Sequence, residues 1–85
     1  MEEEKQTRVA LVGILVENKE QTANLNQILH EYAEYIIGRM GVPYAKKDVN
    51  IISVAVDAPE GKISALSGKL GMLEGVSTKV IYAQK

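Results

Sequence analysis

The sequence predicts an α+β domain with the ferredoxin-like element order βαββαβ. Four stretches rich in β-branched and apolar residues are interleaved with two stretches in which apolar residues recur every three or four positions. This order corresponds to a four-stranded antiparallel sheet of order 4-1-3-2 with two helices on one face. The 85 residues, 46% of them apolar, suffice for one thin core. We expect residues 1–7 to be a flexible lead-in and residues 8–85 to form the single domain.

The first strand and helix occupy the first part of the chain. Residues 8–17 (RVALVGILVE) are apolar on both alternating sets, which is typical of a strand buried on both faces. Asn18, with Gln21 three positions later, resembles a capping box, so a helix is predicted to begin there. An apolar stripe at helical spacing follows, consisting of Leu25, Ile28, Leu29 and Tyr32.

The end of this helix has two interpretations. The apolar stripe allows it to end near Ala33 or to continue to Met40. Two glycines, β-branched residues and a proline between positions 35 and 44 favour a strand from about residue 35 to residue 42.

The second half repeats the pattern. A hairpin connection at residues 45–48 leads into a strand at residues 49–57 (VNIISVAVD). The second helix is predicted over residues 59–73, with Asp57 as its cap, Pro59 in its first turn and Gly75 after its end. The last strand is predicted over residues 76–83.

The two central strands predict an assembly. Strands 8–17 and 49–57 lie in the middle of a 4-1-3-2 sheet, where two helices cover only one face. Both alternating sets of their side chains are nevertheless largely apolar, apart from Ser53 in the later strand. Because monomeric proteins rarely expose a contiguous apolar face, we expect a homo-oligomer, a dimer or tetramer, formed through the open sheet face.

Composition excludes several functional classes. A net charge of -1 offers no strong field for phosphates, so direct nucleic-acid binding is not expected. The absence of cysteine excludes disulfides and thiolate ligands. The longest apolar run, residues 9–16, is far shorter than the ~20 residues of a membrane helix, and the acidic start does not resemble a signal peptide. A cytoplasmic protein with no membrane segment is expected.

The segment SALSGKLG, residues 64–71, contains the motif that most resembles a phosphate-binding loop. Its spacing does not match G-x-x-x-x-G-K-[ST], and it lies within a predicted helix, so nucleotide chemistry is excluded. Its small residues project as one strip along the helix, which favours close packing against the first helix. A ligand approaching the strip at Ser67 and Gly68 is the alternative.

Few other residues are candidates for chemistry. His30 is the only histidine, and metal sites usually need several such ligands, so no metal site and no cofactor are predicted. Arg39 is the best basic candidate near a subunit groove, and Glu17 and Asn18 lie in the first strand-to-helix loop, where polar groups can meet a ligand. No nucleophile with a base and an orienting group is recognisable, so we expect no enzymatic activity.

Three segments, LHEYAEYIIGRMGVPY, VNIISVAVD and ISALSGKLGMLEGV, together resemble the family of iron-only hydrogenase system regulators. The resemblance covers nearly the whole chain from about Arg8. It implies a regulatory role and a fold related to ACT-type regulatory domains and to the ligand-binding domain of nickel-responsive transcription regulators.

The sequence departs from these relatives. The histidines and cysteine that bind nickel in those regulators have no counterpart in GVPYAKKDVNI, so their metal site is not carried over. Seven leading polar residues are too few for their ribbon-helix-helix DNA-binding domain, and the loop ENKEQ lacks the glycine common in amino-acid-binding ACT domains.

Two functional hypotheses therefore stand. The first is a non-enzymatic regulatory module, a homo-oligomer that binds a small molecule or a protein partner. The second is a structural interaction module that docks on another protein without a ligand. Direct DNA binding is a third possibility, which the near-neutral charge disfavours.

Overall fold

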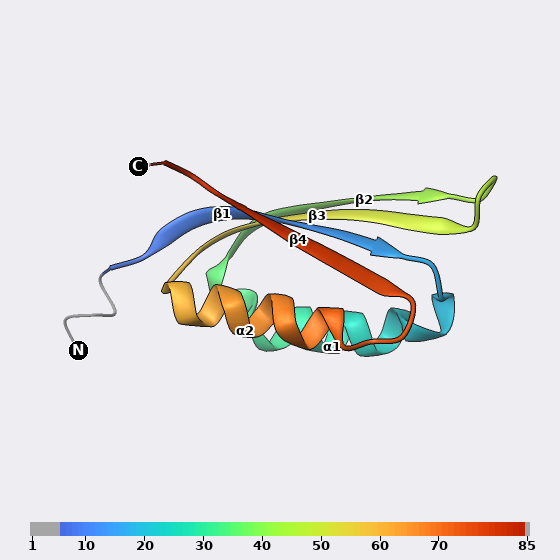
Figure 1. The fold of residues 1–85 in the computed structure, drawn as a ribbon, viewed down its shortest axis with the longest axis horizontal. Coiled ribbons are helices and arrows are strands. Elements are labelled where there is room, and N and C mark those ends of the chain that lie inside the picture. Colours follow the sequence, from blue (N-terminus) through green and yellow to red (C-terminus); the bar gives the residue numbers. More distant parts are fainter. Residues whose placement is uncertain (1–5, 85) are drawn as a thin grey trace.

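A computed structural model describes residues 6–84 of the chain. Within this range, four strands form one antiparallel sheet of order β2-β3-β1-β4, which is the predicted order read from its other edge. The two α-helices lie on one face of the sheet (Figure 1). The predicted fold is therefore confirmed. The elements are β1 (Arg8–Val16), α1 (Thr22–Glu31), β2 (Ile36–Tyr44), β3 (Val49–Ala58), α2 (Glu60–Gly71) and β4 (Val76–Tyr82).

The expected lead-in at residues 1–7 falls mostly outside the described residues, and residues 6 and 7 have no regular structure. No helix within residues 6–84 has the length and the apolar character that crossing a membrane requires.

The core fills the space between the sheet and the helices. Val12 of β1 lies opposite Val54 of β3, and both side chains are fully buried beneath the helices. The helices contribute apolar residues spaced three or four apart, because that spacing places them on one side of a helix. These helical core residues are Leu25 and Leu29 of α1 and Ile63, Leu66 and Leu70 of α2.

The first helix is shorter than predicted at both ends. Asn18 accepts a hydrogen bond from the Glu20 backbone N–H at 3.1 Å, but it caps a short 3-10 turn, and α1 proper begins at Thr22. The reciprocal arm of the predicted capping box is not formed, because the Gln21 side chain accepts from Asn24 instead.

The end of α1 and the start of β2 agree with the strand interpretation. The helix ends at Glu31, a 3-10 turn spans Ala33–Tyr35, and β2 starts at Ile36. The continuation to Met40 is therefore excluded. Glycines and β-branched residues in this segment favour the extended conformation over the helical one.

The cap predicted for the second helix is wrong. Pro59 occupies the cap position and makes no side-chain cap hydrogen bond. Asp57 lies within β3, paired with Val9, because the strand continues through Ala58. The helix ends at Gly71, two residues earlier than predicted, and Gly75 has a φ of 79° in the turn before β4.

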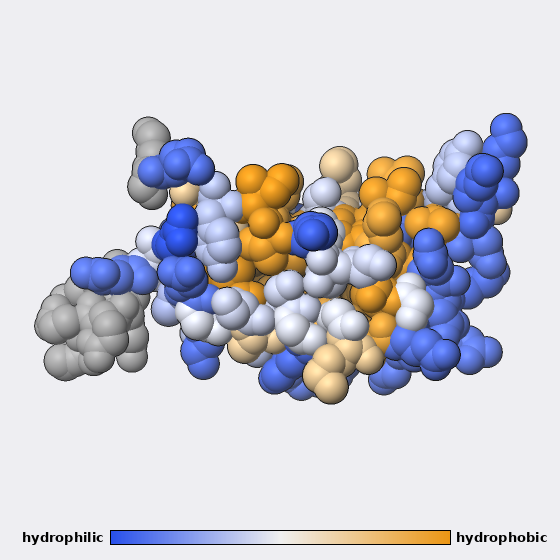
Figure 2. Space-filling view, viewed as in Figure 1, coloured by the Kyte–Doolittle hydropathy of each residue, from blue (hydrophilic) through white to orange (hydrophobic). Residues whose placement is uncertain are grey.

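The face of the sheet opposite the helices is open and largely apolar. The apolar side chains on this face are between 42% and 67% exposed: Val9, Leu11, Met40, Val42, Tyr44, Ile51, Leu15 and Ile81. Figure 2 shows hydrophobic atoms gathered in two groups over the strands, with hydrophilic atoms between them. The described chain thus has the exposed apolar face that its sequence predicts.

Candidate functional site

A β-bulge in β2 determines which way Arg39 points. Ile36 pairs with Val56 and Arg39 pairs with Val54, whose side chains face the helices. Positions three apart in a regular strand face opposite sides, but the register shifts between Ile36 and Gly38. The extra residue therefore places Arg39 on the helix side of the sheet.

Arg39 contacts the first helix through a hydrogen bond. Its Nη2 donates to Oδ1 of Asn26 at 3.1 Å, so β2 and α1 are linked at the edge of the molecule. The other arginine, Arg8, lies 3.5 Å from a carboxylate oxygen of Glu60 and stacks over the Tyr82 ring. Among the described residues, no ion pair involves Arg39. Its guanidinium is exposed and is held by an uncharged partner.

Two hollows lie on either side of this hydrogen bond. The first has a volume of about 200 Å³ and lies between the start of α1 and the strands β2 and β3. The second has a volume of about 370 Å³ and lies beside the later part of α1, where His30 lines it. The first is lined by Val16, Thr22, Leu25, Asn26, Arg39, Gly41, Val42, Pro43, Asn50 and Ile52. Together the two hollows form a groove between α1 and the edge strand β2.

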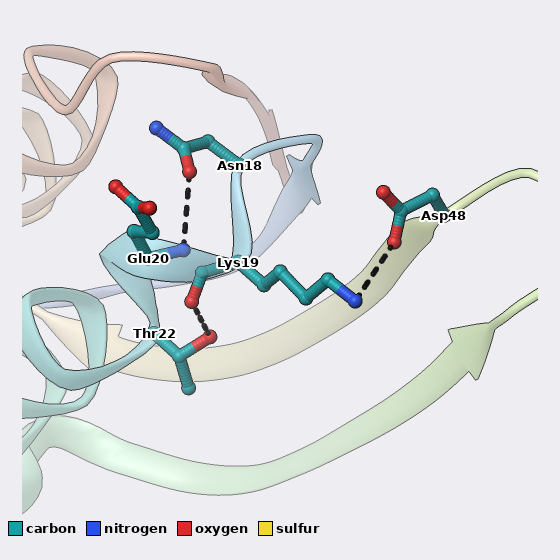
Figure 3. A network of polar contacts seen from close by, with 5 residues as sticks. All are labelled: Asn18, Lys19, Glu20, Thr22 and Asp48. Atoms are coloured by element: carbon teal, nitrogen blue, oxygen red, sulfur yellow. Dashed lines mark hydrogen bonds and ion pairs between the residues drawn. The ribbon is translucent and has the colours of Figure 1, made fainter.

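An ion pair lies beyond the first hollow, beside a further hollow that shares Val16, Pro43 and Asn50 with it. Lys19 Nζ lies 3.5 Å from Oδ1 of Asp48, joining the first loop to the turn between β2 and β3 (Figure 3). Thr22 Oγ1 donates to the Lys19 carbonyl at 2.9 Å, which fixes the start of α1 against this loop. Both charged side chains are well exposed, so the ion pair contributes little to stability.

Glu17 and Asn18, two of the sequence-predicted site residues, lie beside the turn that precedes β4. The Glu17 N–H donates to the Gly75 carbonyl at 2.7 Å. A Cβ at Gly75 would lie 2.7 Å from Cβ of Asn18, so only glycine fits against this loop. Asn18 therefore has two structural roles, as a cap and as a packing partner of Gly75.

The small-residue strip of α2 was predicted to pack on α1, but its contacts are with β4. Ser67 Oγ lies 3.1 Å from Oγ1 of Thr78 on β4, and that threonine also donates to the Ser67 carbonyl. A Cβ at Gly71 would meet the same threonine oxygen at 3.4 Å, whereas a Cβ at Gly61 or Gly68 would meet nothing within 4 Å. Ser67 and Gly71 therefore pack against β4, whereas Gly61 and Gly68 face open space. The strip projects away from α1.

The five sequence-predicted site residues are not brought together. Glu17 and Asn18 adjoin the turn at Gly75, and Ser67 and Gly68 lie on the α2 side of the helix layer, next to the edge strand β4. Arg39 lies on the opposite edge strand, β2. Its side chain lies on the helix side of the sheet.

The groove residues Asn26 and Asn50 were missed from the sequence. A lone asparagine in a helix or strand carries no motif, and nothing local indicates that both would line one hollow with Arg39. Gly38 inside a predicted strand was the available signal, because such a glycine often marks a bulge.

Ionisable groups elsewhere serve helix packing. Nζ of Lys69, in α2, lies 3.5 Å from Oε1 of Glu31 at the end of α1 and over the ring of Tyr32, the residue that follows α1. A hydrogen bond and charge interaction with Tyr32, followed by the nearby Glu31, raise the pKa of Lys69 above its usual value. Within residues 6–84, no three His, Cys, Asp or Glu side chains cluster in a way that could hold a metal.

Comparison with known proteins identifies a family. Residues 8–80 match a family model described as "TM1266-like: Iron-only hydrogenase system regulator, putative". A comparison with curated proteins finds no match.

Solved structures extend this result. The uncharacterized protein TM1266 from Thermotoga maritima is 30% identical, with a TM-score of 0.89 over 93% of this chain and 100% of that one. A formyltetrahydrofolate deformylase from Pseudomonas putida is 12% identical, with a TM-score of 0.66 over 91% of this chain and 29% of that one. This second likeness concerns the fold alone.

Proposed function

Because the chain belongs to the TM1266-like family of iron-only hydrogenase system regulators, we propose that it regulates such a system by binding, without catalysing a reaction. The binding unit is a homo-oligomer assembled through the open sheet face. Its ligand is a small molecule or a protein partner of the hydrogenase system. The observation that carries the proposal is the apolar character of the open sheet face.

The open face has a pattern that suits a second copy of the chain. Across the middle of the sheet, Gly13 lies between Ser53 and Lys79. The neighbouring cross-strand rows carry larger apolar groups, with Leu11 beside Ile81 on one side and Leu15 beside Ile51 on the other. Two apolar ridges therefore flank a shallow centre. A hollow of about 270 Å³ lies over this centre.

The relief is suited to face-to-face packing of two identical sheets. A ridge of one copy can enter the shallow centre of the other, since packed sheets interdigitate their side chains about 10 Å apart. A two-fold axis would then let each copy supply one ridge and one centre. A different protein would need its own surface complementary to these ridges and this centre, because no two-fold axis would relate the two partners.

The area of the face is sufficient for a stable dimer. Strands β1, β2 and β3 have nine or ten residues each, and β4 has seven. At about 3.3 Å per residue and about 4.8 Å between strands, the face measures roughly 30 by 19 Å. Two such faces bury on the order of 1,100 Å², which passes the approximately 1,000 Å² expected of a specific interface.

Sedimentation velocity at micromolar concentration tests the assembly. We expect a dimer or tetramer of the 9.3 kDa chain. A monomer at this concentration would contradict the proposal. A monomer that purifies from its host in stoichiometric complex with another protein, with no bound metabolite, would support the alternative of a structural interaction module.

A further inference from the structure

We propose that the hollow beside Arg39, between α1 and β2, binds a small organic monocarboxylate that has an apolar body and no ammonium group. This inference rests on the proposed ligand-binding role and names the chemical class of the ligand. It concerns the helix side of the sheet, whereas the assembly concerns the open face.

The charge of the hollow favours an anion. Arg39 supplies a guanidinium that forms no ion pair among the described residues, and no Asp or Glu lines either hollow beside it. A guanidinium presents several N–H donors in a planar fork that matches a carboxylate. Asn26 engages only Nη2, so further donors remain for a ligand.

The hydrogen bond to Asn26 prepares the guanidinium for binding. A free arginine side chain loses considerable rotamer entropy when a ligand immobilises it. Here the Asn26 oxygen already holds one end of the fork at 3.1 Å. Because Asn26 carries no charge, it orients the guanidinium without neutralising it. Asn26 is therefore a positioning residue for the carboxylate.

The remaining walls separate into polar and apolar parts. The floor consists of Val16, Leu25 and Ile52, which are 3%, 1% and 8% exposed. Asn50 and Thr22 add neutral polar groups at the rim. A ligand that places its carboxylate on Arg39 can thus lay an apolar body over the floor. The volume of about 200 Å³ favours a ligand smaller than the drug-sized molecules that occupy pockets of about 300 Å³ or more.

Two related ligand classes fit less well. A zwitterionic amino acid brings an ammonium group, which needs an anionic partner, and no carboxylate lines the hollow. A phosphate carries about two negative charges, but the hollow has one cationic side chain and no lysine. The single charge of a carboxylate matches the single guanidinium.

Titration of the ¹⁵N-labelled protein with hexanoate, followed by NMR, tests the assignment. Norleucine, hexanamide and inorganic phosphate serve as comparison compounds, because they add an ammonium group, remove the charge, or remove the apolar body. We expect hexanoate to shift the Arg39 and Asn26 side-chain signals and to bind at least tenfold more tightly than each comparison compound. Equal binding of norleucine or phosphate would overturn the proposed ligand class.

Two arginine variants complete the test. R39Q is expected to weaken hexanoate binding about tenfold or more, the usual loss for a charge-assisted hydrogen-bonded contact. R8Q removes the same charge from an arginine that already pairs with Glu60, and it is expected to leave the affinity unchanged. If R39Q and R8Q weakened hexanoate binding equally, the loss of affinity would come from the change in net charge. That result would overturn the proposed site. Sedimentation of R39Q separates this result from the assembly, which is expected to remain intact.

Discussion

The Arg39 guanidinium donates a 3.1 Å hydrogen bond to Asn26 across the gap between the edge strand and the first helix. This contact joins residues 13 positions apart and divides the groove into two hollows. An arginine bound to an amide keeps its full charge.

The substitution N26D is expected to abolish hexanoate binding with little change in stability. The side chain keeps its size, but its new charge pairs with Arg39 and neutralises the hollow. Because the pair is exposed, the free energy of unfolding should change by less than about 1 kcal/mol. Hexanoate titration and urea unfolding measure the two effects. Unchanged affinity in N26D would show that Arg39 does not recognise the anion.

Charge on the open sheet face is expected to dissociate the oligomer. Leu11 is 42% exposed in the single chain, so L11E should fold, but a buried carboxylate in the interface is costly. Sedimentation velocity should show a monomer. M72E is the matched control, because Met72 is 86% exposed and follows α2 on the helix side. An oligomer that persists in L11E would place the interface elsewhere.

Glycine substitutions are expected to have opposite effects at two positions. G75A should destabilise the fold by about 1–3 kcal/mol, because its φ of 79° is left-handed and its Cβ would lie 2.7 Å from the Asn18 Cβ. G68A should stabilise the fold by about 0.5–1 kcal/mol, because a Cβ there meets nothing within 4 Å and alanine favours the helix. Urea unfolding midpoints measure both. Equal changes in the free energy of unfolding for G75A and G68A would contradict the difference between these two positions.

Loss of the first-loop cap is expected to cost moderate stability. The Asn18 side chain accepts from the Glu20 N–H, so N18A should lower the free energy of unfolding by about 1 kcal/mol. N18D keeps the acceptor oxygen and should retain most of this stability. Thermal unfolding followed by circular dichroism compares them. If N18D were as unstable as N18A, the hydrogen bond would not be the source of the effect.

The sequence by itself determined the elements, their order and the two-sided apolar character of the central strands. These features depend on local periodicity, because a period of two or of 3.6 places apolar residues on one side of a strand or helix wherever the element lies. The apolar sets of residues 9–16 therefore predicted both the core and the exposed open face. From them we also expect a homo-oligomer through that face, which stays a prediction.

Tertiary structure decided the surroundings of each candidate residue. The bulge at Ile36 and Gly38 turned Arg39 toward α1, and the placement of α2 beside β4 turned Ser67 toward Thr78. Periodicity could not predict these contacts. One extra residue in a strand moves every later side chain to the opposite face of the sheet. A strip on a helix contacts whichever element packs beside it.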